Sequence, residues 1–224
     1  HFGSDQLVKC IHHLRGNPGT RQAVIQIWDA EDLVKETIDK ACNTQIIFSR
    51  GIDGKLDMTV FNRSNDIWWG AYGANAVHFS FLHEFISRSV SMPLGEYRQV
   101  SNNFHFYTDL YDVSTYFDSP PDTSDYDHYG RGVTPYPIMD NTDYRGFLEE
   151  CEQFCDDPFQ MGSTDVASGY KKYKHAFFTD VAMPMAKVSQ VRKSWMGDGL
   201  EEASHIKASD WRLAVEQWIK RRQK

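Results

Sequence analysis

Cys42 is the side chain of this sequence best suited to nucleophilic chemistry. It stands directly before a β-prone run, residues 44–48, and just after the charged pair Asp39-Lys40. A thiol exposed at the end of a strand beside a cation is readily deprotonated, and a thiolate is a good nucleophile. An isolated cysteine also packs well as a small buried apolar residue. Both interpretations of Cys42 stay open, whereas Cys10 lies in an amphipathic pattern and is predicted to be a core residue.

Two arginines that border predicted strands are candidates for binding a phosphate. Arg21 begins one strand, and Arg63 follows another and is itself followed by Ser64. A guanidinium matches the oxygens of a phosphate, and a neighbouring hydroxyl adds a donor. An arginine taken singly is more often a solvated surface charge. The two arginines alone therefore do not decide the function.

Aromatic residues supply two further candidate binding groups. His105 and Tyr107 alternate along a predicted strand, so both side chains face the same way and can bind a sugar hydroxyl together. Trp69, between Trp68 and Gly70, offers a flat apolar surface to a ring-shaped cofactor. Packing of these rings in the protein interior is the alternative interpretation for both groups.

The composition excludes several classes of protein. The 224 residues carry 24 basic and 31 acidic side chains, and the net charge of -7 argues against a general nucleic-acid coat protein. An aromatic content of 14% is too high for a disordered chain, and no apolar run is long enough to span a membrane. The 4 cysteines form no zinc-type spacing and are too sparse for a secreted disulfide scaffold. We therefore expect no metal site and a cytoplasmic location.

The elements that must position the candidate side chains alternate between helices and strands. Hydrophobic spacing identifies the helices, and Asp53-Gly54 between two β-prone runs is typical of a hairpin turn. In chain order we expect a helix over residues 5–15, a strand over 21–28, a hairpin over 44–61, an apolar helix over 74–90 and a strand over 97–107. Such a mixture is typical of an α+β or an α/β protein, and the fold class we expect is α+β.

The second half of the chain has a different character. Residues 108–143 are rich in Asp, Tyr, Pro and Ser, which predicts an irregular surface segment. Residues 144–224 are predicted to be mostly helical, with helices over 144–155 and 210–223 and Ser209 as the cap of the last one. We therefore expect a single domain over residues 1–224, with its core in 1–107 and a helical C-terminal extension.

Five short motifs follow one another in the first half. In order they are Asn17-Pro18-Gly19-Thr20-Arg21, Ala41-Cys42-Asn43 with Phe48, Asn62-Arg63-Ser64-Asn65-Asp66, Trp69-Gly70, and His105-Phe106-Tyr107. This series resembles the thymidylate synthase family, which includes the pyrimidine nucleotide hydroxymethylases. The family has a short turn before an arginine-bearing strand, Pro-Cys-His with a later Phe, Gln-Arg-Ser-x-Asp, an apolar-Gly step and His-x-Tyr. Five ordered matches are far more specific than any one alone.

The resemblance implies a fold and a reaction. The fold is a thymidylate synthase-like mixed sheet covered by helices, in a homodimer packed sheet to sheet. The reaction transfers a one-carbon unit from 5,10-methylenetetrahydrofolate to C5 of a pyrimidine nucleoside monophosphate, dUMP or dCMP. Cys42 would attack C6 of the pyrimidine, which makes C5 nucleophilic. No membrane and no direct nucleic-acid partner are expected.

The resemblance also assigns the phosphate-binding residues. Arg63 would hold the phosphate beside the thiolate of Cys42, and Ser64 would donate to the same phosphate. Arg21 would reach the phosphate bound to the partner subunit. Arginines that bind the phosphate also favour the thiolate, so binding and activation are coupled.

The remaining candidates would bind the folate and the sugar. Asp66 completes the catalytic set and would touch the folate ring, with Trp69 and Gly70 beside it. His105 and Tyr107 would hold the deoxyribose hydroxyl.

Several residues depart from the family pattern. Gln22 stands where the family has a second arginine, Asn43 replaces the histidine after the cysteine, and Asn103 replaces an aspartate near the sugar strand. Ala74 falls on the asparagine that reads the base when the motifs are aligned without a gap. Asn75, one place along, takes that role if the loop shifts. The N-terminal part of the family pattern would precede His1, and the usual C-terminal closing tail is not visible.

These departures favour one product and leave alternatives. They cluster around base recognition and site closure, while the residues for covalent addition are present. A wetter site lets water add to the methylene on C5, so hydroxymethylation is favoured slightly over the reductive methylation of a true thymidylate synthase. A non-catalytic nucleotide-binding protein of the same fold and an unrelated enzyme that pairs Cys42 with a histidine base are the other hypotheses.

Overall fold

The computed structural model describes residues 5–37, 40–110, 112, 128–156, 173–195 and 197–222. The chain divides into two compact units, a first unit of residues 1–120 and a second unit of residues 121–224. The single domain expected from the sequence stays a prediction, and residues 111 and 113–127 of the irregular segment predicted at 108–143 lie outside the described residues. No helix of the described residues is long and apolar enough to cross a membrane.

The first unit is built on a four-stranded mixed sheet. Its order is β1-β2-β3-β5, with β1 (Val24–Gln26), β2 (Asn43–Arg50), β3 (Leu56–Asn62) and β5 (Leu94–Ser101). The first three strands are antiparallel, and β5 is parallel to β3. The predicted hairpin is confirmed as β2 and β3, and its turn contains Gly54 with a φ of 84°, a value that favours glycine.

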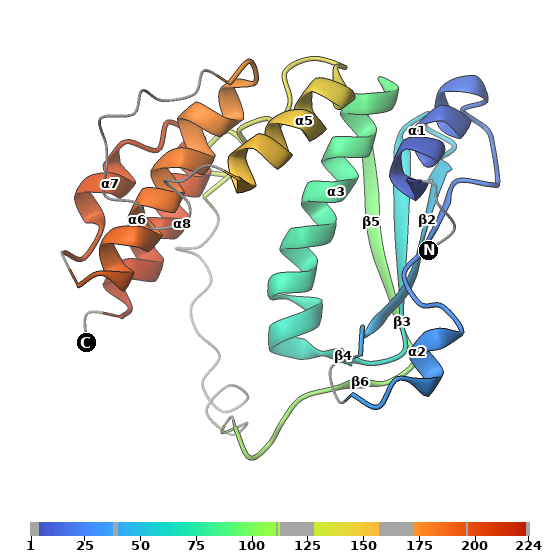
Figure 1. Ribbon diagram of the computed structural model, residues 1–224, viewed down its shortest axis with the longest axis horizontal. Coiled ribbons are helices and arrows are strands. Elements are labelled where there is room, and N and C mark those ends of the chain that lie inside the picture. The colour runs from blue at the N-terminus through green and yellow to red at the C-terminus, as the bar shows by residue number, and fades with distance from the viewer. Residues whose placement is uncertain are drawn as a thin grey trace. The chain divides into compact units, whose positions relative to one another are not determined.

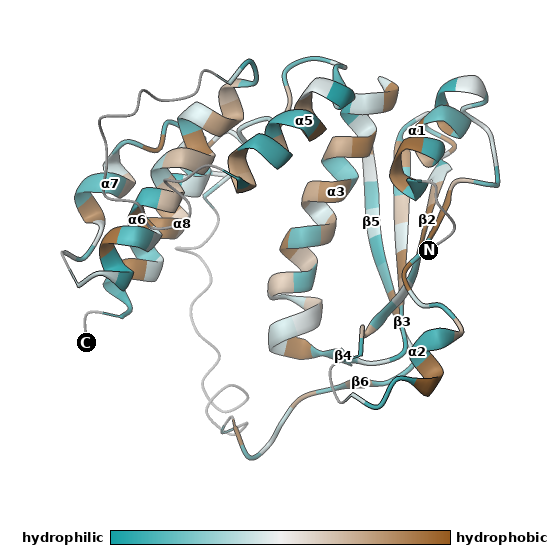
Figure 2. Ribbon diagram, in the orientation of Figure 1, coloured by the Kyte–Doolittle hydropathy of each residue, from teal (hydrophilic) through white to brown (hydrophobic). Residues whose placement is uncertain are grey.

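Two helices cover one face of this sheet. The predicted helices are confirmed as α1 (Gln6–Gly16) and α3 (Ala74–Val90), which pack against each other and against the strands (Figure 1). A parallel pair of strands needs a crossover connection, and α3 supplies it between β3 and β5. Hydrophobic and hydrophilic residues alternate along α3 (Figure 2), as expected for a helix with one buried face. Met58 and Val60 of β3 are fully buried in this layer.

The face of the sheet opposite α3 carries further apolar residues. The strand register places Ile47 beside Val24, and Phe61 beside Val100. Because side chains alternate along a strand, these residues point away from Met58 and Val60. Val24 is 39% and Val100 is 49% exposed. These apolar residues are only partly buried within the first unit, and the register places Thr59 and Arg98 on the same face, beside Ile47.

One end of the sheet carries short elements that the sequence analysis did not separate. After β3 the chain forms β4 (Asn65–Asp66) and a π-helical turn, η1 (Ile67–Ala71). The predicted strand over 97–107 is interrupted, because β5 ends at Ser101 and β6 (Phe104–His105) pairs with β4 in a separate two-stranded sheet. A short helix, α2 (Glu31–Val34), lies in the connection from β1 to β2.

The second unit is helical in its described residues. It contains α5 (Tyr144–Cys155), a π-helical turn η3 (Phe178–Ala182), α6 (Met183–Lys193), α7 (Leu200–Ser204) and α8 (Ser209–Lys220). The expected capping by Ser209 is wrong: Ala208 is the N-cap of α8 and makes no side-chain bond, so Ser209 already lies inside the helix. A mixed sheet covered by helices, with helices following, confirms the α+β fold class.

Candidate functional site

The candidate nucleophile lies at one end of the sheet in the first unit. Cys42 directly precedes β2, and this end also contains the last residues of β1, β3 and β5. The Cys42 thiol is free and partly exposed. Its backbone carbonyl accepts a hydrogen bond of 2.9 Å from the N–H of Arg63, which ties the start of β2 to the end of β3.

Arg63 holds the three residues that lead into β2. Its backbone N–H binds the carbonyl of Cys42, its Nε binds the carbonyl of Ala41 at 3.0 Å, and its Nη2 binds the carbonyl of Lys40 at 2.9 Å. Trp28, just after β1, donates its indole N–H to the same Ala41 carbonyl at 2.6 Å. The ring of Trp28 also lies 5.6 Å from the Arg63 guanidinium carbon. The sequence analysis identified Arg63 but missed Trp28.

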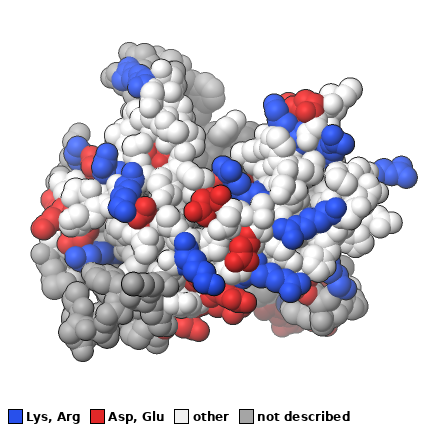
Figure 3. Space-filling model, turned by 90° about the horizontal axis from the view of Figure 1, so that it is seen from above, with Lys and Arg blue, Asp and Glu red and all other residues white. Residues whose placement is uncertain are grey.

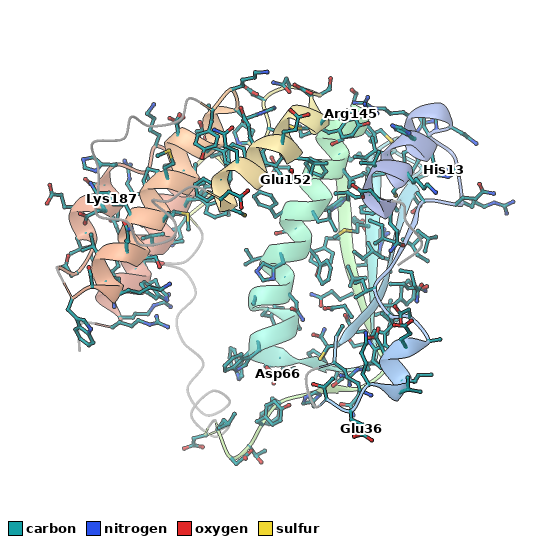
Figure 4. The ribbon with its side chains drawn as sticks, viewed as in Figure 1. His13, Glu36, Asp66, Arg145, Glu152 and Lys187 are labelled. Atoms are coloured by element: carbon teal, nitrogen blue, oxygen red, sulfur yellow. The ribbon has the colours of Figure 1, made fainter. Side chains whose placement is uncertain are left out.

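Asp66 is held by the turn that follows it. Its Oδ1 accepts the backbone N–H groups of Trp68 at 3.0 Å and Trp69 at 2.7 Å, so the carboxylate caps η1. Asp66 lies near the lower end of α3 in Figure 4, where that helix begins. Its other oxygen, Oδ2, is buried and has no hydrogen-bond partner in the described structure. One carboxylate oxygen thus fixes the loop while the other lacks a donor.

The residues of the expected folate and base sites meet around Gly70. A side chain at this buried glycine would place a Cβ 2.1 Å from Oδ1 of Asn65 and 3.5 Å from Nδ2 of Asn75. Gly70 is therefore required by the close approach of Asn65 rather than by its backbone angles. Trp69 is 66% exposed and leaves most of its indole accessible. The structure thus brings Asp66, Trp69, Gly70 and Asn75 together.

The rings of His105 and Tyr107 lie against each other, although β6 ends at His105 and Tyr107 lies outside the strand predicted for both. Their ring centroids are 5.3 Å apart and the ring planes are nearly perpendicular. His105 Nδ1 donates to Oδ1 of Asn103 at 2.9 Å, and the register of β4 and β6 places His105 beside Asp66. The enzyme that would pair Cys42 with a histidine base stays a hypothesis.

A chain of neutral amides connects the strand ends. The amide of Asn43 donates to Asn62, and both Asn62 and Asn65 donate to the hydroxyl of Ser101. Asn65 also donates to Gln99, which in turn donates to the carbonyl of Ala71 in η1. Asn65 and Gln99 also line a pocket of about 300 Å³. The only signal for this network in the sequence is the series of amide residues at the strand ends.

Arg21 does not lie in this cluster. It precedes β1, and Ala23, two residues further along the chain, accepts a hydrogen bond from the backbone N–H of Phe48, near the far end of β2. Six residues of strand separate Phe48 from Cys42, which corresponds to about 20 Å at the usual rise of about 3.3 Å per residue. Arg21 is exposed. Of the predicted site residues, Arg21 alone lies at the opposite end of the sheet.

Charged side chains of both signs occur on the surface. Figure 3 shows basic and acidic side chains interspersed over the face that it presents, which is seen from above. The described residues contain no group of three His, Cys, Asp or Glu side chains that could hold a metal ion.

Comparison with known proteins identifies relatives of both halves of the chain. The sequence model of the family described as "Thymidylate synthase" matches residues 1–117. A deoxyuridylate hydroxymethyltransferase of Pseudomonas phage M6 is 42% identical over 234 residues, covering 99% of this chain and 64% of the phage protein. One of Bacillus phage SP01 is 31% identical and covers 69% of this chain and 42% of its own length.

Thymidylate synthases among the relatives match about half of the chain. That of Listeria monocytogenes serotype 4a (strain HCC23) is 29% identical, covering 46% of this chain and 32% of its own length. The structure of thermostable thymidylate synthase A from Bacillus subtilis has a TM-score of 0.42, 26% identity, and coverage of 51% of this chain and 38% of its own. The chain thus spans less than two thirds of the curated relatives that it matches.

Proposed function

The chain belongs to the thymidylate synthase family, and on that premise we propose that it transfers a one-carbon unit from 5,10-methylenetetrahydrofolate to C5 of dUMP. The product proposed is the 5-hydroxymethyl nucleotide. The observation that carries the proposal is the hydrogen bond from the backbone N–H of Arg63 to the carbonyl of Cys42. It lies at the end of the sheet that also contains Asp66, His105 and Asn75.

Cys42 is the proposed covalent nucleophile. Its thiolate adds to C6 of the pyrimidine, and the electron pair of the C5–C6 double bond moves towards the C4 carbonyl to form an enolate. C5 is then nucleophilic and forms the new carbon–carbon bond. Loss of the C5 proton and cleavage of the bond between the one-carbon unit and tetrahydrofolate leave a methylene group on C5. Water adds to this group, and departure of the thiolate then restores the aromatic ring. The partly exposed position of Cys42 supports this role, because a nucleophile must reach its substrate.

The phosphate of the nucleotide is assigned to Arg63, Ser64 and Arg21. Arg63 uses Nε and one Nη2 N–H on the carbonyls of Ala41 and Lys40, and a guanidinium has further N–H groups for a phosphate. Arg21 lies too far along the sheet to serve its own subunit. We propose that it serves the partner in a homodimer packed sheet to sheet, which the partly exposed Val24 and Val100 on the outer face of the sheet support.

The base is assigned to Asn75. A π-helical turn closes with a bond from residue i+5 to residue i, and the Tyr72 N–H donates to the Ile67 carbonyl at 3.1 Å in this way. Such a turn holds one residue more than an α-helical turn. The one-residue offset between Ala74 and Asn75 is the displacement that this extra residue produces. Asn75 therefore takes the place of the family's base-reading asparagine, with its amide turned towards Gly70.

The folate is assigned to Asp66, Trp69 and Gly70, and the sugar hydroxyl to His105 and Tyr107. The unpartnered Oδ2 of Asp66 is an acceptor suited to the N–H donors of a folate ring, and the exposed indole of Trp69 suits its aromatic parts. When bound, 5,10-methylenetetrahydrofolate supplies the one-carbon unit at the oxidation level of formaldehyde. Asp66 orients this donor through a carboxylate already fixed by two backbone bonds.

Hydroxymethylation is proposed over methylation because of the second unit. The two relatives whose names specify hydroxymethyl transfer match 99% and 69% of this chain, whereas the thymidylate synthase of Listeria matches 46%. Addition of water to the methylene group on C5 gives the hydroxymethyl product. Hydride transfer to the same carbon gives the methyl product of thymidylate synthase. A cytoplasmic location is proposed with this function, since the chemistry needs a reduced Cys42.

A product assay tests the proposal. Full-length protein is incubated with 5,10-methylenetetrahydrofolate and either dUMP or dCMP, and the nucleotides are resolved by mass. We expect hydroxymethylated dUMP with release of tetrahydrofolate. Methylated dUMP with release of dihydrofolate would identify a thymidylate synthase instead, and modified dCMP alone would overturn the assignment of the base.

Two cysteine variants separate covalent catalysis from other effects of thiol loss. Cys42→Ala is expected to abolish the product and any adduct with the nucleotide. Cys155→Ala, at an exposed free thiol of α5, is expected to retain full activity. Product formation by Cys42→Ala would contradict the covalent mechanism.

A further inference from the structure

Trp28 and Arg63 enclose the peptide that leads to the nucleophile. The Ala41 carbonyl accepts from both side chains, from the Trp28 indole at 2.6 Å and from Arg63 Nε at 3.0 Å. A carbonyl oxygen has two lone pairs, so these donors satisfy it fully. The carbonyls on either side, of Lys40 and Cys42, are also bound by Arg63.

The two side chains also contact each other. The Arg63 guanidinium carbon lies 5.6 Å from the centre of the Trp28 ring, within the range of a cation–π contact. Trp28 is itself fixed by the sheet, because its backbone N–H donates to the carbonyl of Thr44 at 3.1 Å. The indole is therefore a rigid support that extends from the β1–β2 pair towards Arg63.

This geometry has a consequence for the chemistry at Cys42. Arg63 carries two tasks, since it binds the backbone before Cys42 and, in the proposed function, the phosphate of the substrate. An arginine side chain has several rotatable bonds and is otherwise free to turn its guanidinium wholly towards a phosphate. The ring of Trp28 and the Ala41 carbonyl, which both side chains bind, keep Nε of Arg63 pointing at Ala41. The remaining N–H groups of the guanidinium are then left for the phosphate.

We propose that Trp28 is a positioning residue for the one-carbon transfer: it fixes Arg63 and the Ala41 carbonyl, and through them the place of the Cys42 thiol relative to the bound nucleotide. This inference rests on the proposed function. It does not require Trp28 to touch the substrate, so substrate binding and the chemical step respond differently to its replacement.

Two variants of the full-length protein separate the contributions of the indole. Trp28→Phe keeps an aromatic face for Arg63 but loses the N–H bond to Ala41, and Trp28→Leu loses both. We expect kcat to fall about tenfold in the first, the rate equivalent of about one hydrogen bond. We expect a larger fall in the second, with the Kd for dUMP within about twofold of wild type in both. Trp195→Phe, at an exposed tryptophan of the second unit, is expected to match wild type.

A spectroscopic measurement tests the contact without turnover. In wild-type protein the Nε–H of Arg63 is expected to exchange with solvent slowly, and in Trp28→Leu about tenfold faster. Unchanged exchange would overturn the inference, as would an unchanged kcat or a parallel loss of kcat and dUMP affinity. If wild-type protein forms no product while the exchange changes as expected, the proposed function fails and the contact between Trp28 and Arg63 stands.

Discussion

The two units bury different kinds of polar group. In the first unit the buried groups at the end of the sheet are the neutral amides of Asn62 and Asn65, and His83 of α3 donates its Nε2–H to the Leu56 carbonyl at 2.6 Å. In the second unit the buried group is a carboxylate, Glu150 of α5. It accepts from the backbone N–H groups of Lys174 and His175 and lies 2.8 Å from Nδ1 of the His175 ring.

The difference shows how each unit tolerates polarity in its interior. The amide N–H groups of Asn62 and Asn65 find acceptors at the site end of the first unit, but two buried oxygens there, Oδ1 of Asn65 and Oδ2 of Asp66, have no hydrogen-bond partner in the described structure. A buried carboxylate is stable only with charged or N–H partners. In the second unit these partners are the backbone N–H groups of Lys174 and His175 and the ring of His175, which contacts Phe147 edge-on. The second unit therefore satisfies both oxygens of its buried carboxylate, whereas the first unit leaves two acceptors open at its site end.

The largest expected effect is the removal of that carboxylate. Glu150→Ala leaves two backbone N–H groups and the His175 ring without their acceptor in a buried place, and is expected to reduce the free energy of unfolding by about 3 kcal/mol. Urea unfolding measures it. Glu149→Ala, at the exposed neighbouring position of α5, is the matched control and is expected to change stability by less than about 0.5 kcal/mol. Equal effects of the two variants would contradict the comparison.

A smaller effect is expected where the first unit is most tightly packed. Gly70→Ala would place a Cβ 2.1 Å from Oδ1 of Asn65, which the bonds to Gln99 and Ser101 hold in place. We expect a loss of about 2 kcal/mol in thermal unfolding, together with reduced activity. Gly16→Ala, at the end of α1 with nothing within 4 Å, is expected to stabilise by about 0.5 kcal/mol. A neutral Gly70→Ala would show that Asn65 is free to move.

The smallest expected effects are losses of stability at acidic pH, and the two units are expected to lose stability in different pH ranges. Burial lowers the pKa of His83, against the opposing bond to Leu56. The unfolded chain therefore takes up a proton first as pH falls below about 6.5, and the first unit loses stability from there. Burial alone would raise the pKa of Glu150, but the bonds from Lys174 and His175 outweigh it and lower the pKa below 4.5, so its contribution is lost only at more acidic pH.

Amide hydrogen exchange resolves the two responses, because it reports β2 and β3 separately from α5. His83→Gln is expected to flatten the response of the first unit between neutral pH and pH 5, and Glu150→Gln that of the second unit below about pH 4.5. Exposed Glu152→Gln should leave both profiles unchanged. If the amides of α5 lost their protection from exchange at a higher pH than those of β2, the comparison would be reversed.

Regular elements could be predicted from the sequence, since local patterns determine them. The period of α3 and the Asp53-Gly54 turn of the hairpin both identify their elements without help from distant residues. The break between β5 and β6 was not predicted, although three polar residues in a row, Ser101-Asn102-Asn103, interrupt the alternation. The change of pairing partner from β3 to β4 depends on residues distant in the sequence. The prediction that Ser209 caps α8 was wrong, because a serine before an apolar stripe does not determine at which residue the first turn begins.

The candidate site divides in the same way. Cys42, Arg63 and His105 could be found because motif order identifies them, and the roles assigned to them stay predictions. The structure adds Trp28 and the amide chain, whose contacts join residues far apart in the sequence, such as Asn62 to Ser101 and Trp28 to Ala41. Nothing in the local pattern around Trp28 distinguishes it from a core tryptophan at the end of a strand.

The bonds from Arg63 and Trp28 have a consequence for sequence drift. Both side chains bind backbone carbonyls, so they do not read the side chains at positions 40 and 41. The family that this sequence resembles has a proline before its cysteine, and the proline ring restrains the backbone there. Ala41 has no such ring, and the side chains of Trp28 and Arg63 restrain the same peptide by hydrogen bonds to its carbonyl. The residue at position 41 can therefore change without releasing the backbone before Cys42, so long as Trp28 and Arg63 stay.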